Sequence, residues 1–423
     1  MDQDKEESKV KYTISKSENG RDIIRIDNDD KEESKISKAD AVKVVSKWAE
    51  GAKSKKKEII IFCLLAVLVI MLLLVHNLRK FKDYDVTASY DRSDGAETTY
   101  MDFQNNLLRY SRDGAFYTNY NGDLIWNYTY EMTNPRVDVC GNYVLIYDKS
   151  GTQIAIMTPT GFKQSIKTSM PIVDAHIAKP GTVGILMQDG GTGYIELCDV
   201  TGTVLASGEL HMSKSGYPMS IDISDDGVNL AVTQMDLGIG NVKTTIAFYN
   251  FGAAGKNKDN NIVATYSYSN QIFPKIAYLS NGNAVAFGNG EVVLFNNDSK
   301  VSVKKEYFPE GDIKKVVYND KYFGYICDAT NKSGEIINQL NVYSGTGLRR
   351  VQKAVDGTFT DISFMSNDEI LLSNGIDVSI YTLTGIEKFK YTFDEQIYNI
   401  LPGDGSKRYV FIKDGKTDMV RFR

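Results

Sequence analysis

Short apolar segments rich in Val, Ile, Tyr, Phe and Thr alternate with turns of Gly, Asn and Asp from residue 86 to the last residue. No stretch of this region repeats its hydrophobic residues at helical spacing, so the pattern predicts strands throughout. One type of turn recurs about every 44 residues, which is the spacing of β-propeller blades. These turns lie at Gly122, Gly161, Gly202, Gly252, Asn297, Gly347 and Gly385. We therefore expect an all-β propeller over residues 86–423.

The first strand of each repeating unit gives the number of blades. Eight such segments align by eye: Tyr100–Phe103, Arg136–Val139, Ile172–Ala175, Ser220–Ile223, Lys275–Tyr278, Lys315–Tyr318, Thr360–Ser363 and Tyr398–Leu401. The last unit has room for only three strands before Arg423, and Asp85–Asp91 is expected to supply the fourth and close the ring. Eight blades are favoured, with seven as the alternative if one terminal unit is degenerate. An array of β-sandwiches would need linkers that the sequence does not show.

An uncharged apolar run, Ile59–Val75, precedes this region and is long enough to cross a bilayer. Lysines are more numerous on its N-terminal side, which favours a cytoplasmic N-terminus and an extracytoplasmic C-terminal domain. The chain is thus expected to be an integral, single-pass protein of the cell membrane. We assign one transmembrane helix to 58–76 and a stalk to 77–85.

Residues 1–57 are rich in Lys, Glu, Asp and Ser and contain few aromatic residues. Such a composition buries too little apolar surface to offset the entropy of ordering. We expect a cytoplasmic, mostly disordered tail, with a short amphipathic helix at 38–52 as the exception.

Three segments, Asn121–Tyr128, Asn134–Pro135 and Gly141–Asp148, resemble an uncharacterised family of single-pass propeller proteins of Gram-positive bacteria. This resemblance implies the location and the fold, and it transfers no catalytic residues. The Gly122 to Trp126 spacing is similar to the blade-docking element of quinoprotein-type propellers. Trp126 is the only tryptophan beyond the apolar run, whereas that element recurs blade after blade in those families. No quinone or other cofactor is therefore expected, and only a general likeness to WD40-like propellers remains.

Recognisable catalytic chemistry is missing from the sequence. From residue 86 onward there are two histidines, His176 and His211, and no nucleophile elbow or zinc-protease motif. Three cysteines, Cys140, Cys198 and Cys327, lie in separate repeats without a Cys-x-x-Cys pair. We expect no catalytic, cofactor-binding or metal-ligating residues. The excess of acidic over basic residues in this region argues against nucleic acid as a partner.

One recurrent feature is an aspartate in five of the eight first strands: Asp102, Asp138, Asp174, Asp222 and Asp361. The innermost strand of a propeller faces its axis, so these side chains could form an incomplete acidic ring that lines the channel. Clustered carboxylates would attract cations or basic peptide segments. Alternatively, each aspartate accepts a backbone N–H bond within its own blade and stiffens the repeat.

These observations predict a binding or scaffolding module for a protein, a peptide or cell-wall material. Two alternatives from other classes remain open. One is a glycan-active hydrolase or lyase that uses paired carboxylates, and the other is a transmembrane sensor with a short cytoplasmic tail.

Overall fold

The computed structural model describes residues 12–16, 22–26, 60–68, 79–93, 97–211, 216–238, 241–297, 300–355 and 359–423. The chain divides into two compact units, Met1–His76 and Asn77–Arg423, and each is described here by itself. In the first unit, β1 (Tyr12–Lys16) pairs antiparallel with β2 (Asp22–Ile26), and residues 60–68 are helical. Both strands contain Ile, a residue that favours extended structure.

The expectations for the first unit have mixed outcomes. The strand pair β1–β2 was not expected in a tail interpreted as mostly disordered. Among the described residues, no helix combines the length and the apolar character needed to cross a membrane. The rest of the expected span, residues 58–59 and 69–76, lies outside the described residues, as does the expected helix at 38–52.

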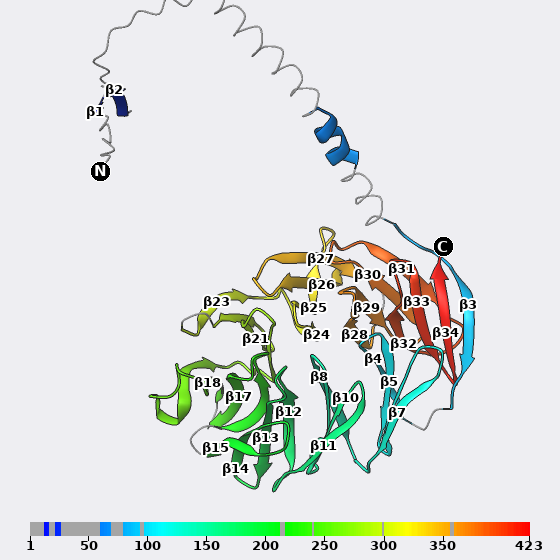
Figure 1. Ribbon diagram of the computed structural model, residues 1–423, viewed down its shortest axis with the longest axis horizontal. Helices are drawn as coiled ribbons and strands as arrows, with labels where there is room; N and C mark the ends of the chain where they lie inside the picture. Colours follow the sequence, from blue (N-terminus) through cyan, green and yellow to red (C-terminus); the bar gives the residue numbers. More distant parts are fainter. Residues whose placement is uncertain are drawn as a thin grey trace, which may run out of the picture. The chain divides into compact units, whose positions relative to one another are not determined.

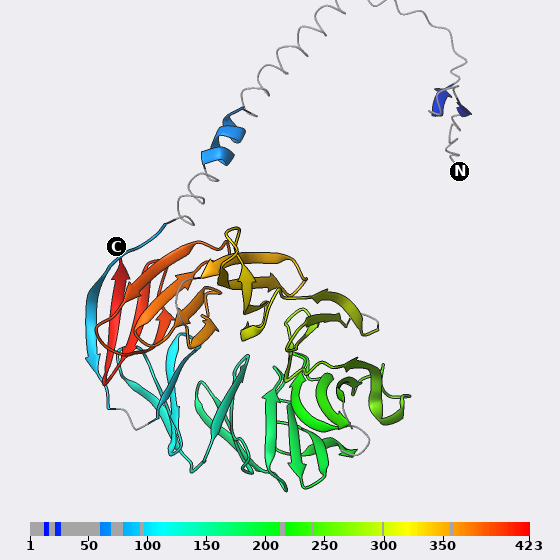
Figure 2. The ribbon, with the colours of Figure 1, turned by 180° about the vertical axis from the view of Figure 1, so that it is seen from behind.

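The described residues of Asn77–Arg423 form eight four-stranded antiparallel sheets, arranged as blades around a common centre (Figures 1 and 2). The eight-bladed propeller expected from the repeat is thus confirmed. Each blade is built of four strands, named here from the innermost to the outermost. Blade 1 contains β4 (Thr99–Phe103), β5 (Asn106–Ser111), β6 (Gly114–Thr118) and β7 (Leu124–Thr129). Blade 2 contains β8 (Pro135–Cys140), β9 (Tyr143–Asp148), β10 (Gln153–Thr158) and β11 (Gly161–Lys167). Blade 3 contains β12 (Ile172–Ile177), β13 (Val183–Asp189), β14 (Thr192–Cys198) and β15 (Val204–His211). Blade 4 contains β16 (Tyr217–Ile223), β17 (Asn229–Gly238), β18 (Asn241–Asn250) and β19 (Ile262–Ser269), with the 3-10 turn η1 (Asp259–Asn261) before β19.

The other four blades follow the same order. Blade 5 contains β20 (Lys275–Tyr278), β21 (Ala284–Phe287), β22 (Val292–Asn296) and β23 (Ser302–Tyr307). Blade 6 contains β24 (Ile313–Tyr318), β25 (Tyr322–Thr330), β26 (Ile336–Ser344) and β27 (Arg349–Val355). Blade 7 contains β28 (Asp361–Phe364), β29 (Ile370–Ser373), β30 (Asp377–Tyr381) and β31 (Glu387–Thr392). Blade 8 contains β32 (Ile397–Pro402), β33 (Arg408–Lys413), β34 (Lys416–Phe422) and, from the start of the propeller, β3 (Tyr84–Asp91).

The ring is closed by the pairing of β3 with β34, at the place where Asp85–Asp91 was expected to act. The two strands run antiparallel, and Tyr84 lies opposite Phe422. Arg92 follows β3 and donates to the backbone carbonyls of Lys416 and Lys413 at 2.8 and 2.7 Å. Its guanidinium also lies 4.8 Å from the ring centre of Tyr100 in blade 1. This joint, called the seam below, therefore ties blade 8 to blade 1 as well as β3 to β34.

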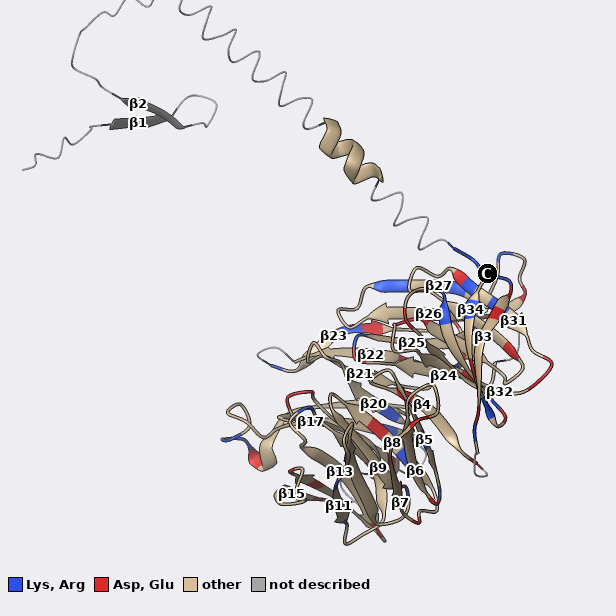
Figure 3. Ribbon diagram, turned by 45° about the vertical axis from the view of Figure 1, so that its right-hand side comes forward, with Lys and Arg blue, Asp and Glu red and all other residues tan. Residues whose placement is uncertain are grey.

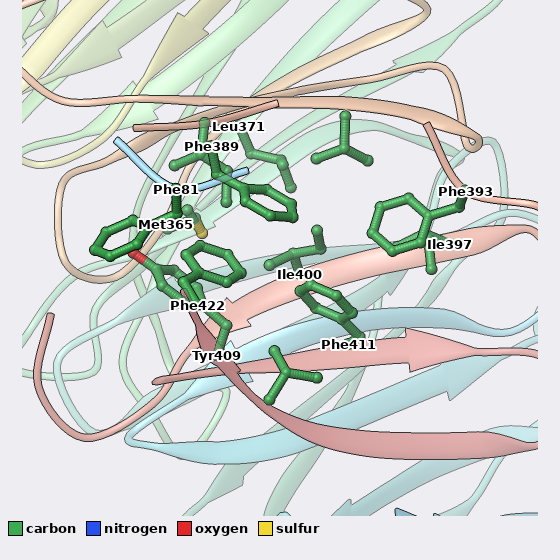
Figure 4. Packing of buried hydrophobic residues seen from close by; sticks show 13 residues of the cluster. Phe81, Met365, Leu371, Phe389, Phe393, Ile397, Ile400, Tyr409, Phe411 and Phe422 are labelled. Atoms are coloured by element: carbon green, nitrogen blue, oxygen red, sulfur yellow. The ribbon is translucent and has the colours of Figure 1, made fainter. Parts of the chain in front are cut away.

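Apolar side chains fill the space between neighbouring blades, and the cluster between blades 7 and 8 is an example (Figure 4). The ring of Phe422 stacks on Phe389 with their centres 4.0 Å apart and on Tyr409 at 4.2 Å. All eight blades also share a β-bulge where the third strand pairs with the fourth. Because the bulge fixes the register in every blade, equivalent positions can be compared around the ring.

Candidate functional site

The five aspartates singled out in the sequence all lie on innermost strands, which surround the centre of the ring (Figure 1). Asp102 is on β4, Asp138 on β8, Asp174 on β12, Asp222 on β16 and Asp361 on β28. Charged residues of both signs occur around β8 and β20 (Figure 3). The structure brings three of the five together and leaves Asp102 and Asp361 elsewhere.

Asp138, Asp174 and Asp222 converge on the imidazole of His176, which is only 9% exposed. The Nδ1 atom of His176 lies 3.1 Å from Asp138 Oδ1 and 3.6 Å from Asp222 Oδ1. Its Nε2 atom lies 3.3 Å from Asp174 Oδ1. Strands of three consecutive blades thus contribute to one buried charge cluster.

Lys275, at the start of β20, adds a fourth blade to this cluster. Its Nζ lies 3.3 Å from Asp174 Oδ2 and 3.1 Å from His176 Nε2. It is also 5.9 Å from the ring centre of Tyr318 on β24, within range of a cation–π contact. Two adjacent cationic side chains therefore share the carboxylate of Asp174, which also accepts bonds from the hydroxyls of Tyr147 and Ser220.

The surroundings shift the pKa values in this cluster. Burial and Lys275 lower the pKa of His176, but Asp138, Asp222 and Asp174 outweigh them, and the pKa lies well above 6.5. Burial raises the pKa of Asp222 to about 6 although His176 and Lys275 oppose the shift. Burial also raises the pKa of Asp174, yet His176 and Lys275 overcome it and hold that pKa well below 3.8. At neutral pH the cluster therefore contains an imidazolium, an ammonium and at least two carboxylates.

The same aspartates link neighbouring blades through backbone bonds. Asp138 accepts the backbone N–H of Ile177 at 2.8 Å, and Asp222 accepts that of Tyr278 at 2.6 Å. Asp174 accepts the more distant N–H of Ile221 at 3.4 Å. In all three cases the donor belongs to the next blade in the ring. Asp222 also accepts the backbone N–H of Ile223 in its own blade at 2.8 Å. The bond within one blade anticipated from the sequence is thus present at Asp222, and bonds to the next blade are added to it.

Asp102 and Asp361 have other partners. Asp102 accepts the hydroxyl of Tyr120 at 2.8 Å, and Asp361 accepts the backbone N–H of its neighbour Ile362 at 2.9 Å. Asp361 lines a small pocket of about 200 Å³ between blades 7 and 8. The acidic ring as a ligand-attracting device remains a prediction.

A larger central pocket of about 470 Å³ lies beside Asp102, and we call it the central pocket. Its walls are the innermost strands of blades 1, 7 and 8 and the turn that follows the innermost strand of blade 6. Lys321 Nζ donates to Asp368 Oδ2 there at 2.8 Å, and Asn319 donates to the other oxygen of Asp368 at 2.9 Å. Burial and the charge of Asp225 raise the pKa of Asp320, a fourth polar residue of the pocket.

Each carboxylate of the buried cluster already accepts bonds from protein donors. Within the described residues, no group of three His, Cys, Asp or Glu side chains has a geometry that could hold a metal ion. The role of Lys275 was not predicted from the sequence. A lysine at the start of an otherwise apolar innermost strand could have indicated it, because a buried lysine needs a partner of opposite charge.

A family of unknown function, DUF5711, matches residues 77–422. The chain belongs to this family. The match confirms one part of the resemblance found in the sequence, namely that the chain belongs to an uncharacterised family. A comparison with curated proteins finds no relative that matches the chain.

Several solved propellers are similar in shape to this DUF5711 chain. BamB from Moraxella catarrhalis is 13% identical, with 80% of this chain and 100% of BamB covered and a TM-score of 0.47. The computationally designed Ika8 protein is 13% identical, with coverage of 82% and 100% and a TM-score of 0.48. The WD40 domain of Neurospora crassa Pan2 is 9% identical, with coverage of 68% and 88% and a TM-score of 0.42. The fold assignment itself rests on the sheet topology described above.

Proposed function

We propose that this DUF5711 protein is a membrane-anchored binding module whose propeller holds a protein, peptide or cell-wall ligand outside the cytoplasm. The observation that carries the proposal is the central pocket, to which four different blades contribute. A pocket of this volume falls in the range typical of ligand sites, about 300–1,000 Å³. Its polar groups include Asp102, Asp320 and the Lys321–Asp368 ion pair, which suit a ligand with hydrogen-bonding and charged groups.

The proposed anchor is the apolar run Ile59–Val75. The lysines before it support a cytoplasmic N-terminus. Antibodies against a tag placed after Arg423 should label intact cells, and antibodies against a tag placed before Met1 should label only permeabilised cells. Labelling of both tags only after permeabilisation would contradict the extracytoplasmic location.

The binding role can be tested by photo-cross-linking with the full-length chain in intact cells. A photoreactive residue at exposed Ser366, which lines the central pocket, should capture a discrete partner. The same residue at exposed Ser165, on the outermost strand of blade 2, is the matched control. Equal capture at both positions, or turnover of a glycan without any captured partner, would overturn the proposal.

A further inference from the structure

A second cavity opens between blades 3 and 4, away from the centre of the ring. We call it the side slot; its volume is about 620 Å³. One wall is β15, with Ala206 and Gly208, and the other is blade 4, with Gln234, Tyr249 and Asn260. Glu209 is the one charged residue among the described residues that line it. The side slot therefore combines an apolar surface with hydrogen-bonding groups.

A glycine at a position that is large in the other blades explains why this space is open. In blade 3, Ala206 is the first residue of the outermost strand β15 that pairs after the bulge. Gly208 follows two residues later and pairs with Ile195. The residues at the same position in the other seven blades are Tyr128, Ile166, Tyr266, Tyr307, Lys353, Tyr391 and Tyr90. All seven are large and at least partly buried. Blade 3 alone among the eight has no side chain there.

The backbone at Gly208 does not require glycine. A Cβ atom added to Gly208 would meet no other atom within 4 Å, and its φ is not in the left-handed region. Elsewhere the chain uses glycine for positive φ, as at Gly202. Neither backbone strain nor crowding therefore accounts for the missing side chain.

In three other blades, the equivalent side chain bonds to one particular carbonyl of the next blade. Tyr266 and Tyr307 each donate from the hydroxyl, to Val301 and Gly347, both at 3.0 Å. Lys353 donates to Gly385 at 3.1 Å. In the outermost strands of blades 5, 6 and 7, the last residues that pair before the bulge are Val303, Arg349 and Glu387. Each of the three acceptors lies two residues before one of them.

For the side slot, the residue at this acceptor position is Asn260, two residues before Ile262. Asn260 lines the slot. Asn260 thus occupies in blade 4 the position whose carbonyl receives a tyrosine hydroxyl in blades 5 and 6, and blade 3 supplies no tyrosine to it.

A separate observation also points to an absent ligand. The side chain of Gln234 is 3% exposed, lines the side slot, and has an Nε2 with no hydrogen-bond partner. A buried donor left without an acceptor costs about 1–3 kcal/mol. A ligand carbonyl that reached this donor, after a small movement of the Gln234 side chain, would remove that cost.

We propose that the side slot binds an extended peptide segment of a protein partner that inserts a tyrosine side chain where blade 3 has Gly208. The tyrosine hydroxyl donates to the carbonyl of Asn260, and a backbone carbonyl of the segment accepts the N–H of Gln234. A smaller adjoining cavity of about 370 Å³ shares Ala206 with the slot and is lined by Leu205, which is 55% exposed. The site is separate from the central pocket, so its test is independent of the proposed function.

The test uses the full-length chain in detergent and the blocked peptide Gly-Gly-Tyr-Gly-Gly, observed by saturation-transfer NMR. The same peptide with alanine in place of tyrosine and N-acetylglucosamine are the comparison probes. We expect the tyrosine peptide to bind at least about tenfold more tightly than the alanine peptide, a difference of roughly 1.4 kcal/mol.

Two variants test the geometry. Gly208→Tyr should fill the slot, weaken binding of the tyrosine peptide at least tenfold, and preserve or raise the thermal midpoint. Gly191→Tyr, also at a glycine with open space around its Cβ, is the matched control and should leave binding unchanged. Gln234→Leu should weaken binding several-fold in a folded protein, which keeps the test valid if Gly208→Tyr fails to fold.

Three results would overturn the proposal. These are equal binding of the tyrosine and alanine peptides, undiminished binding by folded Gly208→Tyr, and preferential binding of N-acetylglucosamine. The last result would assign the slot to a glycan.

Discussion

At His176, three carboxylates and one ammonium group act on a single buried imidazole ring. Burial alone would favour the neutral ring, as would Lys275 at 3.1 Å. The carboxylates of Asp138, Asp174 and Asp222 outweigh both, so the ring stays protonated at neutral pH. The arrangement makes the stability of the fold depend on pH, because the histidine of the unfolded chain titrates near 6.5.

The first prediction concerns the direction of that dependence. The folded-state pKa of His176 is raised, so its stabilising contribution is complete below pH 6.5 and is lost as pH rises toward the folded-state value. The loss approaches about 1.4 kcal/mol per pH unit. Denaturant unfolding at pH 6 to 9 should show this decline in the native protein and a flatter profile in His176→Gln. Parallel profiles would contradict a raised pKa.

The second prediction compares two lysines. Lys275→Met removes one of the two cations beside Asp174 and leaves His176 as the other, and breaking a buried ion pair costs up to about 3–5 kcal/mol. Lys179→Met breaks a pair of 2.6 Å with Asp225, but Lys179 is 52% exposed, and solvent screening limits the cost to about 1 kcal/mol or less. Chemical denaturation of both variants checks the difference. Similar losses of unfolding free energy in the two variants would show that burial does not determine how much each ion pair stabilises the fold.

At the scale of strands, three aspartates join the innermost strands of blades 2 to 5. Asp138, Asp174 and Asp222 each accept a backbone N–H from the following blade. These bonds therefore hold neighbouring innermost strands in fixed relative positions.

The third prediction follows from the bond between Asp222 and Tyr278. Asp222→Leu leaves the N–H of Tyr278 without its acceptor and should cost about 1–3 kcal/mol. Asp222→Asn retains an acceptor and should cost less, because the pKa of about 6 shows that the charged form is poorly accommodated. Thermal unfolding of the two variants at pH 7 measures the difference. A larger loss for Asn than for Leu would refute the blade-linking role.

Strand patterns in the sequence predicted most of the architecture. The eight first strands and the closing segment Asp85–Asp91 follow from a repeat that local turn chemistry makes visible. The convergence of Asp138, Asp174 and Asp222 on His176 could not be predicted, because it depends on distances between blades. The open space next to Gly208 could not be predicted either. A glycine in a strand can be recognised as a missing side chain only when the register of all eight blades is known.

Across the whole molecule, the seam between β3 and β34 is the one joint in the described propeller made by strands from opposite ends of the domain. Every other described blade pairs strands that are neighbours in the sequence. The aromatic cluster around Phe422 stabilises this joint, with Phe389 on one side and Tyr409 on the other.

The fourth prediction tests the seam. Phe422 is 1% exposed, and Phe422→Ala should cost about 3–5 kcal/mol because it leaves a cavity between blades 7 and 8. Phe308→Ala is the control, since Phe308 is 68% exposed and its loss should change stability by about 0.5 kcal/mol or less. Limited proteolysis should also cleave β3 faster in Phe422→Ala. Unchanged cleavage would mean that the seam does not limit opening of the ring.

The seam also sets the order of events during synthesis. Thr87 of β3 donates to the carbonyl of Met419, which is 332 positions later in the chain. While the ribosome makes blades 1 to 7, the partner strand of β3 has not yet been made. The edge of β3 stays unpaired during this time and can pair with a wrong strand. A product that stops before β34 can fold blade by blade but cannot complete the circle. Emergence of β34 is therefore the step that lets β3 pair and the ring close.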